Sequence, residues 1–240
     1  MKGSKITTYI ADKEFFNKIR SQSKLAYVGQ TRSEEIFNTL THALASLLSV
    51  AGFIVLISFT ASGGDLTRIL TCGLYGISLI FLYVASMLYH GSSNYKRKKF
   101  FHMLDHSAIF ILIAGTNTPI LLTYLPEHWG WEIFWAAWVL AATGVFLEIF
   151  MAGKIPKYIS ISLYSLMGWM ILLAAKPMFE ILPGGLLNWL FLGGITYMIG
   201  IIFYVRKTLF FNHVIWHLVV MLGSAFHYIG ILSYVAMKVD

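Results

Sequence analysis

The residues of this chain best suited to chemistry are histidines and carboxylates gathered in a few short stretches. Two pairs of histidines are four residues apart: His102 with His106, and His213 with His217. On a helix this spacing puts both imidazoles on one face, about 6 Å apart along the axis. One helix can offer two nitrogen ligands to a metal ion in this way. Either pair is therefore a candidate half of a metal site.

A third ligand and a bound water must come from other segments. The chain has a single cysteine, which leaves histidine, carboxylate and hydroxyl groups as ligands. His90 can supply the third imidazole, and Ser86 lies four residues earlier on the same helical face. Asp105 can hold a metal-bound water. Three imidazoles and a water form the open arrangement of catalytic zinc, which lowers the pKa of that water to about 7. Zinc is the expected cofactor.

Further polar residues follow the same helical phase. Glu35, Asn38 and His42 lie at positions i, i+3 and i+7 and share one face. They are interpreted either as a polar wall of the same cavity or as hydrogen-bonding residues that lock their helix to its neighbours. His227 follows His213 by fourteen residues and is expected to look inward along the same seam. A haem site with this spacing would need a second such helix, and one helix alone carries it.

These residues must be positioned by helices that lie in a membrane. The chain is 58% hydrophobic and 12% charged, about half the charged fraction of soluble domains. Such a composition excludes a soluble globular fold. Continuous apolar runs of about 20 residues, separated by short turns, predict an all-α polytopic bundle. The seven expected spans are 36–61, 68–90, 104–124, 131–151, 157–175, 186–204 and 213–236.

Basic residues predict the orientation of the bundle. Fifteen of the 18 lysines and arginines fall in the N-terminal segment or in the loops after the second, fourth and sixth spans. This asymmetry indicates a cytoplasmic N-terminus, an outer C-terminus and a location in the inner or plasma membrane. The metal site then faces the cytoplasm. The net charge of +7 thus reflects topology and not a nucleic-acid partner. The basic run 96–99 is expected to contact anionic lipid.

The expected domain organisation is simple. Residues 1–35 are polar and have the composition of a short cytoplasmic tail, without the apolar core of a cleavable signal peptide. Residues 36–240 form the seven-span domain, which leaves no room for a separate soluble domain. Membrane lipids are the expected partners, with a lipid or fatty acid as a candidate ligand. The sequence does not predict a protein partner.

Three separated motifs carry a family resemblance. Residues 86–90 (SMLYH) and 101–106 (FHMLDH) resemble the SxxYH…LDH signature of the hemolysin III family. Residues 35–42 (EIFNTLTH) are similar to its ExxNxxTH pattern. Residues 213–217 (HVIWH) and 223–228 (GSAFHY) resemble its HxxxH…GSxxHY element. The family is the bacterial branch of the progestin and adipoQ receptor superfamily.

The resemblance implies a role for each of these residues. It implies a seven-helix bundle with zinc near the cytoplasmic face, bound by His90, His213 and His217. It further associates Asp105 and Ser86 with the zinc-bound water. His102 and His106 then become residues of an outer shell, or residues that face lipid headgroups.

Two classes of function are compatible with such a site. The first is a zinc-dependent hydrolase of lipid amide or ester bonds, with Asp105 as proton acceptor and Ser86 orienting the water or the oxyanion. Relatives in the wider superfamily resemble ceramidases, which favours this chemistry by analogy. The second is a non-enzymatic, receptor-like, membrane-homeostasis or haemolytic protein with structural zinc. Turnover of a lipid substrate would discriminate between them.

Overall fold

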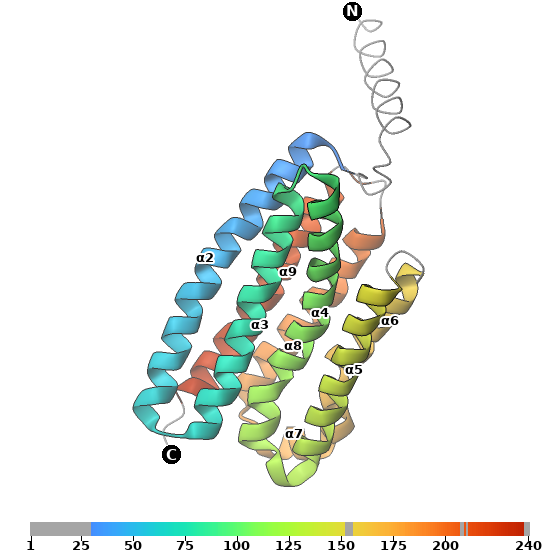
Figure 1. The fold of residues 1–240 in the computed structure, drawn as a ribbon. Helices are drawn as coiled ribbons and strands as arrows, with labels where there is room; N and C mark the ends of the chain where they lie inside the picture. Colours follow the sequence, from blue (N-terminus) through green and yellow to red (C-terminus); the bar gives the residue numbers. More distant parts are fainter. Residues whose placement is uncertain (1–29, 152–155, 207–208, 210, 238–240) are drawn as a thin grey trace, which may run out of the picture.

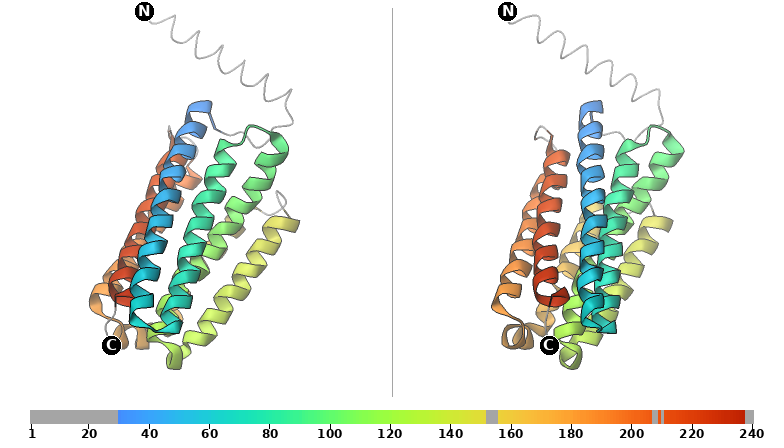
Figure 2. Two further views of the ribbon diagram at one scale, coloured as in Figure 1. Left: turned by 60° about the vertical axis from the view of Figure 1, so that its left-hand side comes forward. Right: turned by 90° about the vertical axis from the view of Figure 1, so that its left-hand side faces the viewer.

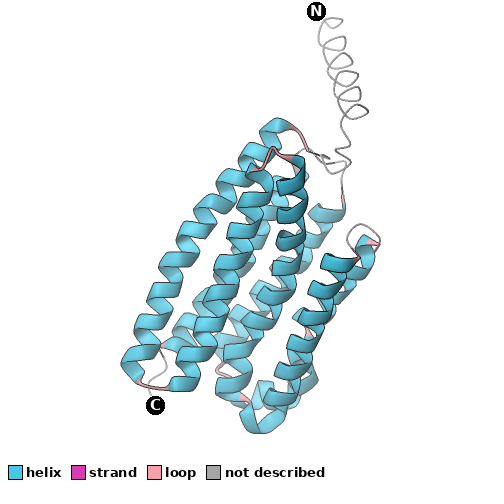
Figure 3. Ribbon diagram, in the orientation of Figure 1, coloured by secondary structure: helices cyan, strands magenta, loops and turns pink. Residues whose placement is uncertain are grey.

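The chain is a bundle of long helices, seen in a computed structural model that describes residues 30–151, 156–206, 209 and 211–237 (Figure 1). Within these residues there is no strand (Figure 3). Seven helical segments of the described chain are long and apolar enough to cross a membrane. The helices are α2 (Arg32–Gly63), α3 (Leu66–Gly91), α4 (Tyr95–Tyr124), α5 (Trp131–Phe150), α6 (Lys157–Gly168), α7 (Ala175–Ile181), α8 (Gly184–Val205) and α9 (Asn212–Ile231). The expectation of an all-α, seven-span membrane protein is confirmed.

Short helical turns complete three of the spans. A turn at Pro126–Gly130 (η1) leads into α5, and one at Leu232–Ala236 (η3) follows α9. The turn Met170–Ala174 (η2) joins α6 to α7, so that the fifth span is a broken helix. The sequence predicts this span as one continuous run, 157–175. The structure differs because the regular helix ends at Gly168 and resumes at Ala175.

Neighbouring helices in the sequence are neighbours in space. Helix α3 packs between α2 and α4, and α5 packs on the other side of α4 (Figure 1). Helix α9 packs on α8 and closes against α2, which brings the first and last spans side by side (Figure 2). The start of α2, the end of α3 and the starts of α4 and α9 therefore meet at one end of the bundle. The candidate residues come from these four helix ends.

Polar residues at helix starts explain where the long helices begin. Thr31 caps α2 in a capping box with Glu34, in which each side chain bonds the other residue's amide. Asp65 caps α3, and the Asn94 side chain accepts hydrogen bonds from two amides of α4. Gly64 separates α2 from α3 with φ 70°, a left-handed conformation that suits glycine. Such caps satisfy amides that apolar surroundings would leave unpaired.

Two helix starts lie earlier than the sequence predicts. Helix α2 begins at Arg32 and not at residue 36, so Glu35 lies in its first turn. Helix α4 begins at Tyr95 and not at residue 104, because Asn94 caps it ahead of the basic run. The basic run is thus the first turn of a helix and not a loop. Residues 1–29 of the expected tail lie outside the described residues, and the division at residue 35 stays a prediction.

The bundle turns an apolar surface outward. Leucines and isoleucines of α2 are widely exposed, and Leu47 reaches 71%. In water this would be an unstable surface, whereas a bilayer accepts it. The interior holds smaller and polar residues together with aromatic ones, including fully buried Tyr75 and Phe110. The protein is therefore a multi-pass membrane protein.

Candidate metal centre

Three histidines from the second and last spans meet at one end of the bundle. His90 lies in the last turn of α3, and His213 and His217 lie in the first two turns of α9. One nitrogen of each ring lies within 4.8 Å of the corresponding nitrogen of the other two. His90 and His217 are buried, at 4% and 2% exposed. Within the described chain, this is the one group of three or more such side chains that converge closely enough to hold a metal ion.

The free nitrogens of these rings fit a metal ion. The Nε2 atoms of His90 and His213 and the Nδ1 atom of His217 are buried and have no hydrogen-bond partner among the described residues. Buried polar atoms are nearly always hydrogen-bonded, and leaving one unpaired is costly. Three histidines that each keep a bare nitrogen, and whose ligand atoms lie within 4.8 Å of one another, offer the donor set of an open zinc site. The arrangement therefore satisfies the chemistry that zinc requires.

The remaining nitrogen of His90 is held by helix α2. Its Nδ1 lies 2.8 Å from Oε2 of Glu35. Because an ionised carboxylate can only accept, Nδ1 donates this hydrogen bond, and Nε2 is the ring nitrogen left for a metal ion. The other oxygen, Oε1, accepts a hydrogen bond of 2.9 Å from Nζ of Lys98. A carboxylate behind a ligand histidine is the usual way in which proteins orient such a ring.

The burial of Lys98 differs from what the sequence predicts. The basic run 96–99 is expected to face anionic lipid, yet Lys98 is only 5% exposed, whereas Lys96 and Lys99 are exposed. Its helical phase is the signal that could have revealed this. Lys98, His102 and Asp105 lie at positions i, i+4 and i+7 of α4 and share a face. The pattern becomes visible only when α4 is known to begin before the basic run.

The other two polar residues of α2 contact His217. The ring of His217 hydrogen-bonds to the backbone of Asn38, whose side chain donates to Gln30 over 2.7 Å. His42 stacks on His217 with 3.7 Å between ring centroids and 14° between planes. A stacked ring presents its face and not its nitrogens, so His42 braces the ligand without joining the three. Each of the two interpretations of this polar face applies to one residue. His42 lines a cavity, and Asn38 joins α2 to α9.

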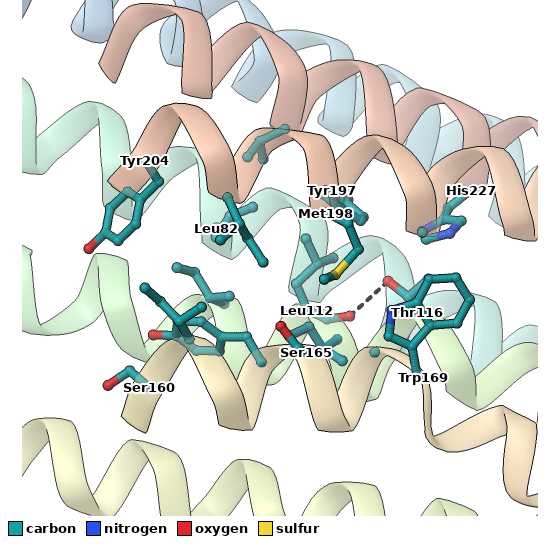
Figure 4. A pocket seen from close by; sticks show the side chains of 18 of the residues that line it. Leu82, Leu112, Thr116, Ser160, Ser165, Trp169, Tyr197, Met198, Tyr204 and His227 are labelled. Carbon is teal, nitrogen blue, oxygen red and sulfur yellow. Dashed lines mark hydrogen bonds between the residues drawn. The ribbon is translucent and has the colours of Figure 1, made fainter. Parts of the chain in front are cut away.

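A cavity of about 260 Å³ begins beside His213 and His217, two of the three histidines, and runs into the bundle. Its walls are mostly apolar and come from α4, α6, α8 and α9. Figure 4 shows Tyr204 and Ser160 at one end and His227 and Trp169 at the other. The Tyr204 ring lies 6.3 Å from the ring of His213, which marks the metal end. The cavity thus joins the candidate metal centre to an apolar interior.

Both residues expected to act on water line this cavity. Ser86, on α3 one turn before His90, is 2% exposed and forms part of the wall. Asp105, on α4, also faces it. Asp105 is not among the three side chains whose ligand atoms converge. It is therefore placed to meet a molecule in the cavity and not to complete the histidine group.

The second histidine pair forms a separate polar cluster. His102 and His106 line the same cavity, with 4.2 Å between their ring centroids. Nδ1 of His106 lies 3.8 Å from Oε2 of Glu148, and Ser160 donates to Oε1 of Glu148 over 3.2 Å. The pair therefore faces the cavity and carries a carboxylate of its own. The group that converges on one point uses the α9 pair instead.

His227 lies toward the far end of the cavity, as its helical phase predicts. Its Nε2 lies 3.2 Å from the carbonyl oxygen of Leu190. The ring packs so closely on α8 that a Cβ at position 193 would lie 2.3 Å from it, which explains the glycine there. His227 thus helps to join α8 to α9 and is remote from the three converging nitrogens.

Known proteins with related sequences share nearly the whole chain. Hemolysin-3 of Bacillus cereus is 40% identical over 212 residues, which cover 88% of this chain and 96% of that protein. The Hemolysin-3 homolog of Bacillus subtilis (strain 168) is 39% identical over 206 residues, 85% of this chain and 95% of the relative. The human monocyte to macrophage differentiation factor is 29% identical over 211 residues, 84% of each chain.

A family model described as Haemolysin-III related matches residues 30–228. The match runs from the residue before the cap of α2 almost to the end of α9, and it includes all the histidines of the candidate centre. The family expected from the motifs is the one found. Together with the identity to the Bacillus proteins, this match shows that the chain belongs to the haemolysin III family.

Proposed function

We propose that this protein is a membrane-embedded, zinc-dependent hydrolase of a lipid amide or ester, with zinc bound by His90, His213 and His217. The observation that carries the proposal is that a mostly apolar cavity reaches His213 and His217, two of the three converging histidines that keep a bare nitrogen. A metal centre that only joined helices would not need such a cavity. A cavity that only accepted a lipid would not need bare imidazoles.

The residues around the cavity supply the remaining chemistry. Zinc bound by these histidines would supply a Lewis acid that activates water at neutral pH and polarises a carbonyl group. Asp105 accepts the proton that the attacking water loses and returns it to the leaving nitrogen or oxygen as the acyl bond breaks. The hydroxyl of Ser86 orients the water or donates to the carbonyl oxygen. The products are a free fatty acid and the amine or alcohol.

The apolar walls select the substrate. Ile109, Leu187 and Phe191 are among the side chains that line the cavity beyond its polar end. They offer an acyl chain surroundings as apolar as the bilayer, and they offer a charged molecule no partner. A long acyl chain therefore places its carbonyl group near the histidines while the tail fills the interior.

The proposed location is a cell membrane, with the metal centre toward the cytoplasm. Exposed basic residues surround the histidine end of the bundle, among them Arg32, Lys96, Arg97 and Lys99. The opposite end carries the exposed Lys176 and also Arg68, which is buried against Asp65. Because basic residues collect on the cytoplasmic side, the centre is assigned to that side.

Turnover of defined lipids tests the proposal. Detergent-purified protein loaded with zinc is incubated with long-chain ceramides and, separately, with phospholipids, and free fatty acid is measured. We expect release that requires zinc and that falls at least about 100-fold in Asp105→Asn, since general base catalysis contributes about 10²- to 10⁴-fold. Asp105→Asn should keep its zinc, because the three ligands are unchanged.

A matched substitution separates chemistry from folding. Glu180→Gln removes a carboxylate of α7 that is exposed and lies outside the cavity, and it should leave fatty-acid release unchanged. If no lipid releases an acyl product while zinc stays bound at one ion per chain, the hydrolase proposal fails. The second candidate then stands: a non-enzymatic membrane protein in which zinc joins α3 to α9. The origin of the ligands from these two helices favours that alternative.

A further inference from the structure

We propose that Lys98 is a positioning residue for the metal ligand His90 and acts through the carboxylate of Glu35. The inference rests on the proposed metal centre and deepens it. It assigns to the centre a charged group that binds no metal and touches no substrate. The three residues form a chain of contacts, called the relay below, in which Lys98 comes from α4, Glu35 from α2 and His90 from α3.

The first support is the position of Lys98 within its own basic run. The three neighbouring basic side chains are exposed, whereas Lys98 turns inward and is 5% exposed. Burial of an ammonium group is costly unless the charge is paired and hydrogen-bonded. A lysine serving topology or lipid contact would gain nothing from this position. Its burial therefore reflects the partner it reaches.

The second support is the use of both oxygens of Glu35. Oε2 lies 2.8 Å from Nδ1 of His90, and Oε1 accepts a hydrogen bond of 2.9 Å from Nζ of Lys98. Both oxygens of the carboxylate are thus engaged, one by the ligand histidine and one by the lysine. A carboxylate held in this way fixes both the tautomer and the direction of the imidazole. The bare Nε2 of His90 is aimed by the relay at its two partner rings.

The third support is a second contact between Lys98 and the last turn of α3. Nζ lies 3.4 Å from the backbone carbonyl oxygen of Tyr89 and 4.8 Å from the centroid of the Tyr89 ring. Tyr89 immediately precedes the ligand. Lys98 therefore holds the residue before His90 directly and His90 itself through Glu35.

The experiment measures zinc affinity in full-length, detergent-purified protein by chelator competition. Lys98→Met keeps most of the aliphatic length and removes the charge. We expect zinc to bind about 10- to 100-fold more weakly, the loss typical when an outer partner of a metal ligand is removed. Lys99→Met is the matched control, because it removes an exposed lysine from the next position. It should bind zinc as the wild type does.

Two further variants separate positioning from folding. Lys98→Arg keeps the charge and should restore most of the affinity. The double variant Glu35→Gln with Lys98→Met removes both charges, so no unpaired charge remains buried. It should regain thermal stability relative to Lys98→Met and still bind zinc weakly, because the neutral amide is a poorer acceptor for His90. With cobalt in place of zinc, the visible absorption spectrum should change in Lys98→Met and in the double variant, but not in Lys99→Met.

The outcomes distinguish this inference from the function it rests on. A wild-type protein that binds no zinc overturns the metal centre itself. A wild-type protein that binds zinc, with equal affinity in Lys98→Met, overturns the positioning role alone. The positioning role also fails if the double variant regains stability and zinc affinity together, because the pair would then be a structural ion pair. If Lys98→Met does not fold, the double variant and Lys98→Arg decide the question.

Discussion

At the scale of single residues, the centre is defined by the nitrogens that remain unpaired. His90 has its Nδ1 hydrogen bond to Glu35 and a bare Nε2, so one ring serves both α2 and the metal centre. His217 contacts the backbone of Asn38 and keeps a bare Nδ1. Both rings are thus held by α2 and still keep an unpaired nitrogen.

Substitution of single histidines should show which of them bind zinc and which only lie nearby. His217→Ala removes one of the three converging nitrogens and should abolish stoichiometric zinc binding, measured by elemental analysis after gel filtration. His102→Ala removes a ring of the other pair and should leave the zinc content unchanged. The same two proteins can be compared by thermal unfolding. His217→Ala should lose the stabilisation that added zinc gives to the wild type, since metal binding adds to the free energy of unfolding. Full zinc content in His217→Ala would contradict the assignment.

The sequence predicts much of this centre and leaves one part out. The spacing of His213 and His217 places them on one face, and the motifs select this pair over His102 and His106. The relay through Glu35 cannot be read from spacing, because Lys98 and Glu35 are 63 residues apart in the chain. Their contact depends on how α2 and α4 pack on α3, which no local pattern encodes.

At the scale of helices, the spans are readable from the sequence because lipid imposes long apolar runs. The ends are less readable, since they depend on caps such as Asn94, which starts α4 nine residues before its apolar part begins. Hydropathy does not show the break in the fifth span, because the residues on both sides of Gly168 are mostly apolar. Gly168 and Pro177 are the signals that could have revealed it, since glycine and proline both disfavour the interior of a helix.

Close packing between α4 and α5 gives a prediction at this scale. A Cβ on Gly144 would lie 2.4–2.6 Å from three ring atoms of buried Phe110. Overpacking costs about 1–3 kcal/mol, and the gain in helix propensity from glycine to alanine offsets roughly 1 kcal/mol of it. Gly144→Ala should therefore lower the melting temperature in detergent by about 2–4 °C, the shift typical of a net loss near 1 kcal/mol.

Gly73→Ala provides the control for that measurement. A Cβ there meets Cδ1 of Ile57 at 3.6 Å, an ordinary contact, so the substitution should raise the melting temperature slightly or leave it unchanged. Equal or greater stability of Gly144→Ala would mean that Phe110 rotates freely. That result would contradict the tight packing of α4 on α5.

At the scale of the whole molecule, the assigned orientation can be tested with introduced thiols. The native Cys72 is fully buried and should not react. Ser93→Cys places an exposed thiol at the histidine end, and Ser62→Cys places one at the opposite end. In spheroplasts of an expression host, a membrane-impermeant maleimide should label Ser62→Cys at once and Ser93→Cys only after the membrane is opened. The reverse pattern would place the metal centre on the outer side.

The origin of the three histidines in the second and last spans has a consequence for biogenesis. His90 enters the membrane with the second span, whereas His213 and His217 arrive with the seventh. A nascent chain that has released only its first six spans holds one of the three histidines. If the proposed zinc site is correct, zinc binds only after the last span meets α3. Under that proposal metal loading marks completed insertion, and a chain truncated before α9 should gain no stability from added zinc.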